Sequence, residues 1–266
     1  MKIARVFPRR TKATPIDALA FTDFPGLFPP EVDEVHVSVA YTYDMEKAEW
    51  LAHQWAHVAP VKMGGPAFGK PSGEFMPGRY LKPGYTITSR GCPNRCWFCS
   101  VWKREPKLIE LPIHDGWNVL DDNILACSES HIRNVFAMLK RQKYPIEFTG
   151  GLEAKLLQPW HIDLLLSIRL KQMFFAYDTA DDRDPLFDAA CLMDTSGINR
   201  NHKARCYVLI GYPNDTISKA ERRLRETAFM GYFPMAMLWK NDDGDTSPEW
   251  RRFQRLWANP HIIASH

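Results

Sequence analysis

The sequence of 266 residues lacks several features that would place it in a particular class of protein. It has no run of about eighteen apolar residues, so it predicts no membrane-spanning helix. The basic residues among the first ten positions are followed by no long apolar stretch. We therefore expect no secretory signal peptide and a cytoplasmic protein. Neither an internal repeat nor a low-complexity tract is present, so no repeat architecture is expected.

An excess of one charge is also missing. The chain has 34 Lys and Arg against 31 Asp and Glu, with a formal net charge of +3. Bulk electrostatics therefore gives no strong case for a nucleic-acid-binding protein. Hydrophobic residues make up 45% of the chain, which is enough for a full core, and the length suits one large domain with or without a smaller appendage.

Three of the cysteines stand in one short segment. Cys92, Cys96 and Cys99 follow the spacing C-x3-C-x2-C. Three thiolates spaced in this way can ligate three irons of a [4Fe-4S] cluster and leave the fourth iron without a protein ligand. An iron with an open coordination position is reactive, so the segment indicates chemistry rather than electron storage alone.

Other interpretations of this segment are a zinc site, a disulfide or a chance grouping. A structural zinc site needs four ligands, and the nearest later candidate for a fourth is His114, outside the usual spacing. Disulfides suit small secreted chains, which this chain does not resemble. The three remaining cysteines share no ligand spacing and are predicted to be small buried apolar residues, not ligands of an auxiliary cluster: Cys127, Cys191 and Cys206.

The cysteine spacing, with the aromatic Phe98 before the last cysteine, resembles the radical S-adenosylmethionine (SAM) superfamily. The resemblance implies a [4Fe-4S] cluster held by Cys92, Cys96 and Cys99, and SAM as the second cofactor. It implies reductive cleavage of SAM to a 5′-deoxyadenosyl radical that removes a hydrogen atom from the substrate. A one-electron donor of the flavodoxin or ferredoxin type is the implied partner.

The amino-terminal part divides into two segments. Residues 1–34 show no sustained period and are predicted to be an extended arm. Residues 35–78 predict a small β-α-β cap, with an alternating strand from Val35, a helix that Asp44 caps, and a short strand from Pro60 to Met63. The cap resembles part of a cobalamin-binding domain but lacks the D-x-H-x-x-G motif. This implies a relic of that Rossmann-like fold without cobalamin, and a plain α/β cap is the preferred interpretation.

Residues 79–245 alternate between strand and helix patterns. Alternation of this kind predicts parallel strands with right-handed crossovers. Six units resemble the partial (β/α)6 barrel of the radical SAM superfamily. The expected fold class is therefore α/β, a partial TIM-like barrel with a small N-terminal α/β extension. The first crossover, residues 100–116, lacks a convincing helix. Ser218 and Glu221 predict a capping box for one later helix, and residues 246–266 are expected to form a C-terminal tail or helix.

In parallel α/β folds, reactive groups gather at the carboxyl ends of the strands. By resemblance, Phe98 lies against adenine, Asp178 contacts the ribose hydroxyls or methionine, and Ile210 with Gly211 packs on adenine, with Met237 or Trp239 completing the pocket. The family's G-G-E motif, which receives the SAM amino group, normally follows the second strand. Asp121-Asp122-Asn123 occupies that place, whereas a literal Gly150-Gly151-Leu152-Glu153 follows the third strand, and either segment fits the role. Each is also typical of a plain turn.

The substrate is indicated by resemblance alone. Residues 84–102 resemble short radical SAM proteins of bacteriophages and bacteria, some of which are implied in hypermodification of DNA bases. The expected substrate is a modified nucleobase or nucleotide, either free or within phage DNA. The expected reaction is a rearrangement of the isomerase type. Arginines interleaved with aromatics at residues 250–257, and a second basic run at 222–225, suit either nucleic acid or solvated helix faces. The alternatives are a radical enzyme acting on a peptide or small metabolite, and a non-enzymatic zinc- or nucleic-acid-binding module.

Overall fold

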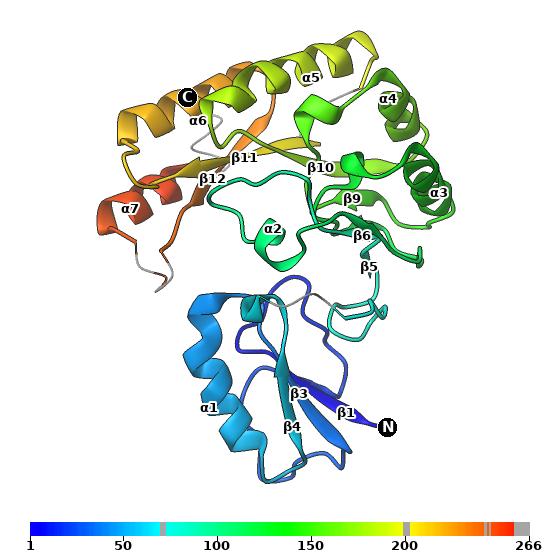
Figure 1. The fold of residues 1–266 in the computed structure, drawn as a ribbon, viewed down its shortest axis with the longest axis vertical. Helices are drawn as coiled ribbons and strands as arrows, with labels where there is room; N and C mark the ends of the chain where they lie inside the picture. The colour runs from blue at the N-terminus through cyan, green and yellow to red at the C-terminus, as the bar shows by residue number, and fades with distance from the viewer. Residues whose placement is uncertain (70–72, 199–202, 242–243, 245, 258–266) are drawn as a thin grey trace. The chain divides into compact units, whose positions relative to one another are not determined.

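The computed structural model divides the chain into two compact units (Figure 1). The first unit comprises Met1–Tyr85 and Gly91–Lys107, and the second comprises Thr86–Arg90 and Leu108–His266. The structure describes residues 1–69, 73–198, 203–241, 244 and 246–257. No helix among these residues is long and apolar enough to cross a membrane.

The first unit is built on a parallel four-stranded sheet in the order β2-β1-β3-β4. Val35, Val37 and Val39 are fully buried or nearly so, as the alternating pattern predicts, and they pack with Leu51 and Trp55 of the helix α1. The elements of this unit are β1 (Ile3–Val6), β2 (Ala20–Phe21), β3 (Glu34–Ser38), α1 (Met45–Trp55), β4 (Val61–Gly64) and the short α2 (Val101–Arg104).

The amino-terminal segment differs from the expected extended arm. Its residues Ile3–Val6 form β1, which pairs with both β2 and β3 inside the sheet. Ala4 and Val6 have no exposed surface. A strand of four residues is too short to show a sustained period, which explains why the sequence pattern did not reveal it. Asp44 is the N-cap residue of α1, as predicted, but its carboxylate makes no capping hydrogen bond. It accepts hydrogen bonds from Nε and Nη2 of Arg9, each at 2.6 Å.

The second unit contains a six-stranded sheet in the order β12-β11-β10-β9-β8-β5. Every neighbouring pair from β8 to β12 is parallel, as alternating strands and helices predict. The strands are β5 (Tyr85–Thr86), β8 (Asn118–Val119), β9 (Ile146–Phe148), β10 (Leu170–Ala176), β11 (Ala204–Ile210) and β12 (Phe233–Leu238), with β6 (Ser89–Arg90) and β7 (Ile109–Glu110) as a separate antiparallel pair. The helices are α3 (Glu129–Lys140), α4 (Pro159–Leu166), α5 (Arg183–Thr195), α6 (Ile217–Phe229) and α7 (Pro248–Leu256).

The parallel α/β sheet of the expected partial barrel is present, but closure into a barrel is not present among the described strands. These strands form an open sheet that ends at β5 and β12. Both β5 and β8 are two residues long, so that side of the sheet offers few backbone groups for closure. The first crossover has no long helix, in agreement with the sequence, and contains only the four residues of α2.

Alternate residues of the parallel strands point to opposite faces of the sheet. One face packs against the helices and forms the core, and there the rings of Phe136 in α3 and Phe148 in β9 stack at 5.6 Å. The other face carries polar and aromatic side chains. Phe174 and Tyr207 stack there with ring centroids 5.1 Å apart, next to Arg205. This second face was not identified from the sequence.

The helix α6 begins two residues earlier than its predicted capping box. Thr216 is the N-cap, and its side chain accepts a hydrogen bond from the backbone N–H of Lys219 at 3.2 Å. Glu221 instead accepts from Arg225, 2.7 Å away. Gly231 follows the end of the helix with a φ of +82°, which is the role the sequence predicts for it.

Candidate functional site

The cysteine segment is a closed loop within the first unit. It starts at Gly91, directly after β6, with a φ of +85°. A Cβ atom at this position would lie 2.1 Å from the carbonyl oxygen of Lys107, closer than any real side chain allows. Only glycine fits, and the two ends of the segment are therefore held together by backbone contact.

All three cysteines of this loop are half-buried, and none takes part in a disulfide. The Cys96 carbonyl accepts hydrogen bonds from the Cys99 N–H at 3.1 Å and from Nε1 of Trp102 at 2.9 Å. The Val101 N–H donates to Sγ of Cys99 at 3.5 Å. A backbone N–H directed at sulfur stabilises negative charge on that sulfur, which suits a thiolate ligand.

The donor set fits an iron–sulfur cluster. In the part of the chain that the structure describes, no three His, Cys, Asp or Glu side chains converge so that they could hold one metal ion. A cluster offers a separate iron to each thiolate, so its ligands do not converge on one point. Three thiols on one loop of restrained backbone therefore suit a cluster by their chemistry, and their assignment as ligands stays a prediction.

Phe98, the residue predicted to lie against adenine, is on the same loop. It is half-buried, and its ring contacts Trp97 edge to face with the centroids 5.3 Å apart. Trp97 itself is 53% exposed. The loop thus presents aromatic surface beside the cysteines, and the adenine contact of Phe98 stays a prediction.

Asp121 anchors the carboxyl end of β8 in the second unit. Its side chain is buried and accepts hydrogen bonds from the Thr88 N–H at 2.6 Å, the Thr88 hydroxyl at 2.5 Å and the Ser89 hydroxyl at 3.0 Å. Burial raises the pKa of the Asp121 carboxyl, and the hydrogen bonds from Thr88 and Ser89 oppose that rise. Asp121 therefore has a structural role, in which it fixes residues 88–89 against β8.

The two segments predicted to receive the SAM amino group lie side by side. Gly150 packs so closely that a Cβ there would lie 2.0 Å from the Asp121 carbonyl oxygen. Nδ2 of Asn123 donates to Oε2 of Glu153 at 2.6 Å. The alternatives that the sequence left open therefore form one polar cluster at the carboxyl ends of β8 and β9.

Two carboxylates, those of Asp122 and Glu153, lie at the edge of this cluster. Asp122 lies 4.0 Å from the Arg90 guanidinium, and Glu153 lies 2.9 Å from the Lys155 ammonium. The side chains of Asp122 and Glu153 are 11% and 14% exposed, so both are largely buried but reachable. Either can accept a hydrogen bond from an ammonium group, and the choice between them stays a prediction.

Asp178 follows β10 and is 7% exposed. Its Oδ1 accepts a hydrogen bond from the Leu209 N–H at 3.0 Å. Burial, reinforced by the negative charge of Asp182, raises the pKa of Asp178 to about 7. A carboxyl group of this kind carries a proton part of the time at neutral pH and can act as donor or acceptor towards a hydroxyl group.

Gly211 and Ile210 differ in what they expose. Gly211 has a φ of +73°, and a Cβ there would lie 2.9–3.1 Å from side-chain atoms of Leu238 and Trp250. The side chain of Ile210 is fully buried in the core, and its carbonyl accepts from the Trp239 N–H at 2.9 Å. Met237 is 37% exposed. Of the residues predicted to form the adenine pocket, Met237 thus presents a side chain, whereas Ile210 offers backbone.

Arg223 belongs to the basic run at 222–225, which was expected to face nucleic acid or solvent, but its side chain is buried. It forms an ion pair with Asp215 at 2.8 Å, and both side chains are buried. Its Nη2 also donates at 2.8 Å to the carbonyl of Leu209, the residue whose N–H donates to Asp178. Arg223 is spaced three residues from Ala220 and four from Thr227, both fully buried. This helical spacing was the signal that could have identified it.

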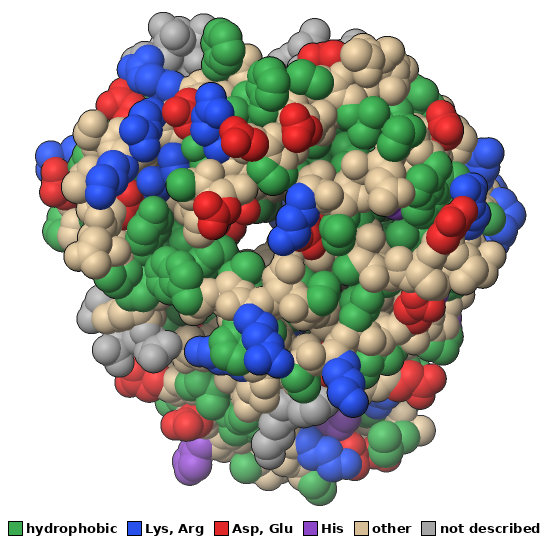
Figure 2. Space-filling model, turned by 45° about the horizontal axis from the view of Figure 1, so that its top comes forward, with side chains coloured by type: hydrophobic (Ala, Val, Ile, Leu, Met, Phe, Trp, Pro, Cys, Tyr) green, Lys and Arg blue, Asp and Glu red, His purple; other side chains and the backbone are tan. Residues whose placement is uncertain are grey.

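The exposed part of that basic run is neutralised by acids on the same helix. Arg225 pairs with Glu221 at 2.7 Å, and Arg222 lies 3.9 Å from Glu226. On the face drawn in Figure 2, basic and acidic side chains alternate in the upper part and form no patch of one sign.

The prediction that the three remaining cysteines are buried was right for Cys127 and Cys206 and wrong for Cys191, which is exposed.

No protein-family model matches the chain, and no curated protein matches it in sequence. Among solved structures, the fold is similar to that of a radical SAM methyltransferase, TsrM from Kitasatospora setae, described with cobalamin and a [4Fe-4S] cluster bound. The TM-score is 0.59 and the identity 12%, over 79% of this chain. The match covers 64% of the TsrM chain. At this identity the likeness shows the fold alone, which is similar to that of this methyltransferase.

Proposed function

We propose that this chain is a radical SAM enzyme. The observation that carries the proposal is the closed loop with three half-buried cysteines, spaced C-x3-C-x2-C, on a chain whose fold is similar to that of a radical SAM methyltransferase. A bound [4Fe-4S] cluster with one open iron would supply reductive cleavage of SAM to a 5′-deoxyadenosyl radical.

The residues divide this work between them. Cys92, Cys96 and Cys99 would hold the cluster, and the Val101 N–H would stabilise charge on the Cys99 sulfur. At the carboxyl ends of β8 and β9, Asp122 or Glu153 would accept hydrogen bonds from the amino group of SAM. Asp178, with its pKa raised to about 7, would contact the ribose hydroxyls.

The proposal extends to the substrate and to the electron donor. We propose a nucleobase or nucleotide as substrate, DNA included, and a flavodoxin or ferredoxin as donor. The support is the resemblance of residues 84–102 to short phage and bacterial radical SAM proteins. Incubation with phage DNA, followed by hydrolysis and mass spectrometry of the nucleosides, tests the substrate; an unchanged nucleoside profile under turnover conditions contradicts it.

The cluster is tested by anaerobic reconstitution with iron and sulfide. Wild type is expected to bind about four irons, to absorb visible light as a cluster does, and to release 5′-deoxyadenosine from SAM after reduction. Cys92→Ala, Cys96→Ala and Cys99→Ala should each lose the cluster spectrum. Cys191→Ala is the matched control, because Cys191 is exposed and remote in sequence, and it should keep full iron content. A colourless protein that yields no 5′-deoxyadenosine would overturn the proposal.

The SAM site is tested separately by binding. Asp122→Ala and Glu153→Ala are each made in the reconstituted protein, and the dissociation constant for SAM is measured by calorimetry. Replacement of the residue that accepts a hydrogen bond from the SAM ammonium group should weaken SAM binding about tenfold or more, since hydrogen bonds to charged groups contribute about 1.5–3 kcal/mol. Asp163→Ala, on the exposed side of α4, is the control. Unchanged affinity in both test variants rules out this cluster as the amino-group site.

A further inference from the structure

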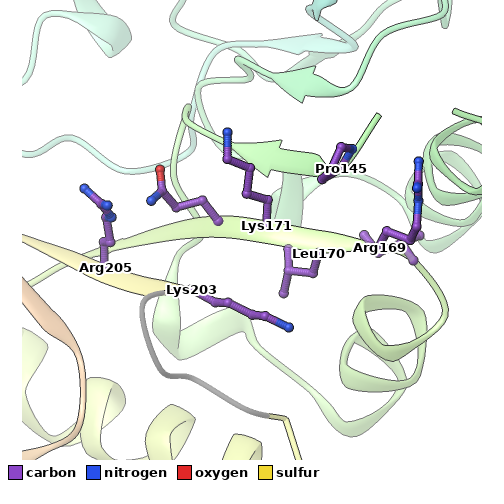
Figure 3. A pocket seen from close by; sticks show the side chains of 8 residues that line it. Pro145, Arg169, Leu170, Lys171, Lys203 and Arg205 are labelled. Atoms are coloured by element: carbon purple, nitrogen blue, oxygen red, sulfur yellow. The ribbon is translucent and has the colours of Figure 1, made fainter. Parts of the chain in front are cut away.

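A shallow, open depression of about 690 Å³, called the cavity below, lies at the amino-terminal ends of β9, β10 and β11 in the second unit (Figure 3). Because β8 to β12 are parallel, this edge of the sheet is opposite to the one that carries Asp122, Glu153 and Asp178. The seven residues of β10 separate the two edges by about 20 Å, at about 3.3 Å per residue.

Four of the residues that line the cavity are cations: Arg169, Lys171, Lys203 and Arg205. In the part of the chain that the structure describes, only Lys171 has an acidic partner, Glu147 at 2.7 Å. Four positive charges less one negative charge leave a local excess of three, as large as the formal net charge of +3 on the whole chain. The cavity therefore concentrates positive charge on a chain that is otherwise balanced.

Arg205 is held in place by its surroundings. With the Gln172 amide turned so that its oxygen faces the guanidinium, that oxygen accepts from Nη2 at 2.7 Å and from Nε at 2.6 Å. The Arg205 guanidinium carbon also lies 5.9 Å from the Phe174 ring centroid and 5.3 Å from that of Phe233. A guanidinium fixed by neutral groups keeps its full charge and loses little side-chain entropy when it binds an anion.

The other cations are placed around the amino-terminal end of β10. In the view of Figure 3, Arg169, Lys171 and Arg205 extend to one side of the strand, and Lys203 lies on the other side. Arg169 donates to the Lys143 carbonyl, which is a neutral partner. The wall thus offers two guanidinium groups and two ammonium groups, all of which can donate to phosphate oxygens.

We propose that this cavity binds phosphate groups of a nucleotide or polynucleotide. The site goes beyond the proposed radical chemistry, because it uses neither the cysteine segment nor SAM. Its place at the edge of the sheet opposite to Asp122, Glu153 and Asp178 makes it an anchoring site for phosphates, separate from that polar cluster.

Three double variants of the full-length protein, each with two positive charges removed, test the proposal. K171Q/R205Q and R169Q/K203Q remove cations from the cavity. K219Q/R222Q removes two from α6, where the Arg222 side chain is 73% exposed, and serves as the control. The probes are inorganic pyrophosphate, ATP, a fluorescent single-stranded oligodeoxynucleotide and polyglutamate. Protein without iron suffices, so failure of the radical SAM proposal would not affect the result.

Wild type is expected to bind pyrophosphate, ATP or the oligonucleotide, and both cavity variants should weaken that binding about tenfold or more. For the oligonucleotide, loss of two phosphate contacts should also make the slope of log K against log salt shallower by about 1.4. Binding of ATP without the oligonucleotide identifies a free nucleotide as the source, and the reverse identifies a polymer. Equal losses in the control, absence of binding to all three phosphate probes, or equal binding of polyglutamate would overturn the proposal. Thermal melts of all variants separate loss of fold from loss of binding.

Discussion

Replacement of Gly150 by alanine tests how tightly the two strand-end segments are packed. The backbone of Gly150 itself is not in the left-handed region, so the cost of a side chain there is steric. The new Cβ would lie 2.0 Å from the Asp121 carbonyl oxygen and 2.7 Å from the Asp121 nitrogen, where real contacts stay above 3.0 Å. One strand end must therefore move by about 1 Å, which also strains the bonds from Asp121 to Thr88 and Ser89.

Overpacking of this kind typically costs about 1–3 kcal/mol, and we expect G150A to lie at the upper end because backbone atoms must move. For a unit of this size, about 3 kcal/mol lowers the melting temperature by about 6–12 °C. The measurement is urea unfolding followed by near-ultraviolet circular dichroism, with thermal melts in parallel.

Two other glycines calibrate the result. At Gly151 the nearest atom to a new Cβ is 3.9 Å away, so no steric clash is expected. G151A should lower the free energy of unfolding by about 1–2 kcal/mol, through the strain of a side chain at a φ of +102°. At Gly64 nothing lies within 4 Å and φ is not positive, so G64A should be neutral or stabilising by up to about 1 kcal/mol. If G150A were no less stable than G151A, the close approach to Asp121 would not be a real constraint.

Three further predictions concern burial and capping. Because the pKa of Asp178 rises from 3.8 to about 7, the folded state holds its proton more tightly than the unfolded chain, and stability falls as pH rises from about 4 through 7. D178N should remove about 2–4 kcal/mol of that fall, as seen in denaturant midpoints between pH 4 and 8, and a parallel pH profile in both proteins would contradict it. R223Q should cost about 3–5 kcal/mol because it leaves the buried Asp215 without its cation, whereas R225Q on the exposed face should cost less than about 1 kcal/mol; similar unfolding midpoints for the two would refute the difference in burial. T216A should cost about 1 kcal/mol by loss of the cap and S218A close to nothing, and the reverse order in thermal melts would restore the predicted capping box.

Periodic elements were predictable from the sequence because their pattern directly reflects burial. In α3, the apolar residues Ile132, Val135, Phe136 and Leu139 recur at helical spacing, and all four are buried as expected. The parallel order of β8 to β12 followed from strands that alternate with helices, since a crossover helix favours parallel pairing.

The parts that could not be predicted depend on contacts between distant residues. The sequence of β1 contains too few residues to show alternation, and its place in the sheet depends on pairing with β3. Closure of a sheet into a barrel is a property of strand length and curvature that local patterns do not encode. The contact between Asn123 and Glu153 was not predictable either, because it joins two strand ends thirty residues apart.

The position of β1 has a consequence for how the protein is made. Ile3–Val6 lies between β2 and β3 in its sheet, and β3 begins at Glu34. Both edges of this strand are therefore satisfied only after segments up to about thirty residues further along the chain have folded against it. Expression of this protein should consequently respond to chaperone supply.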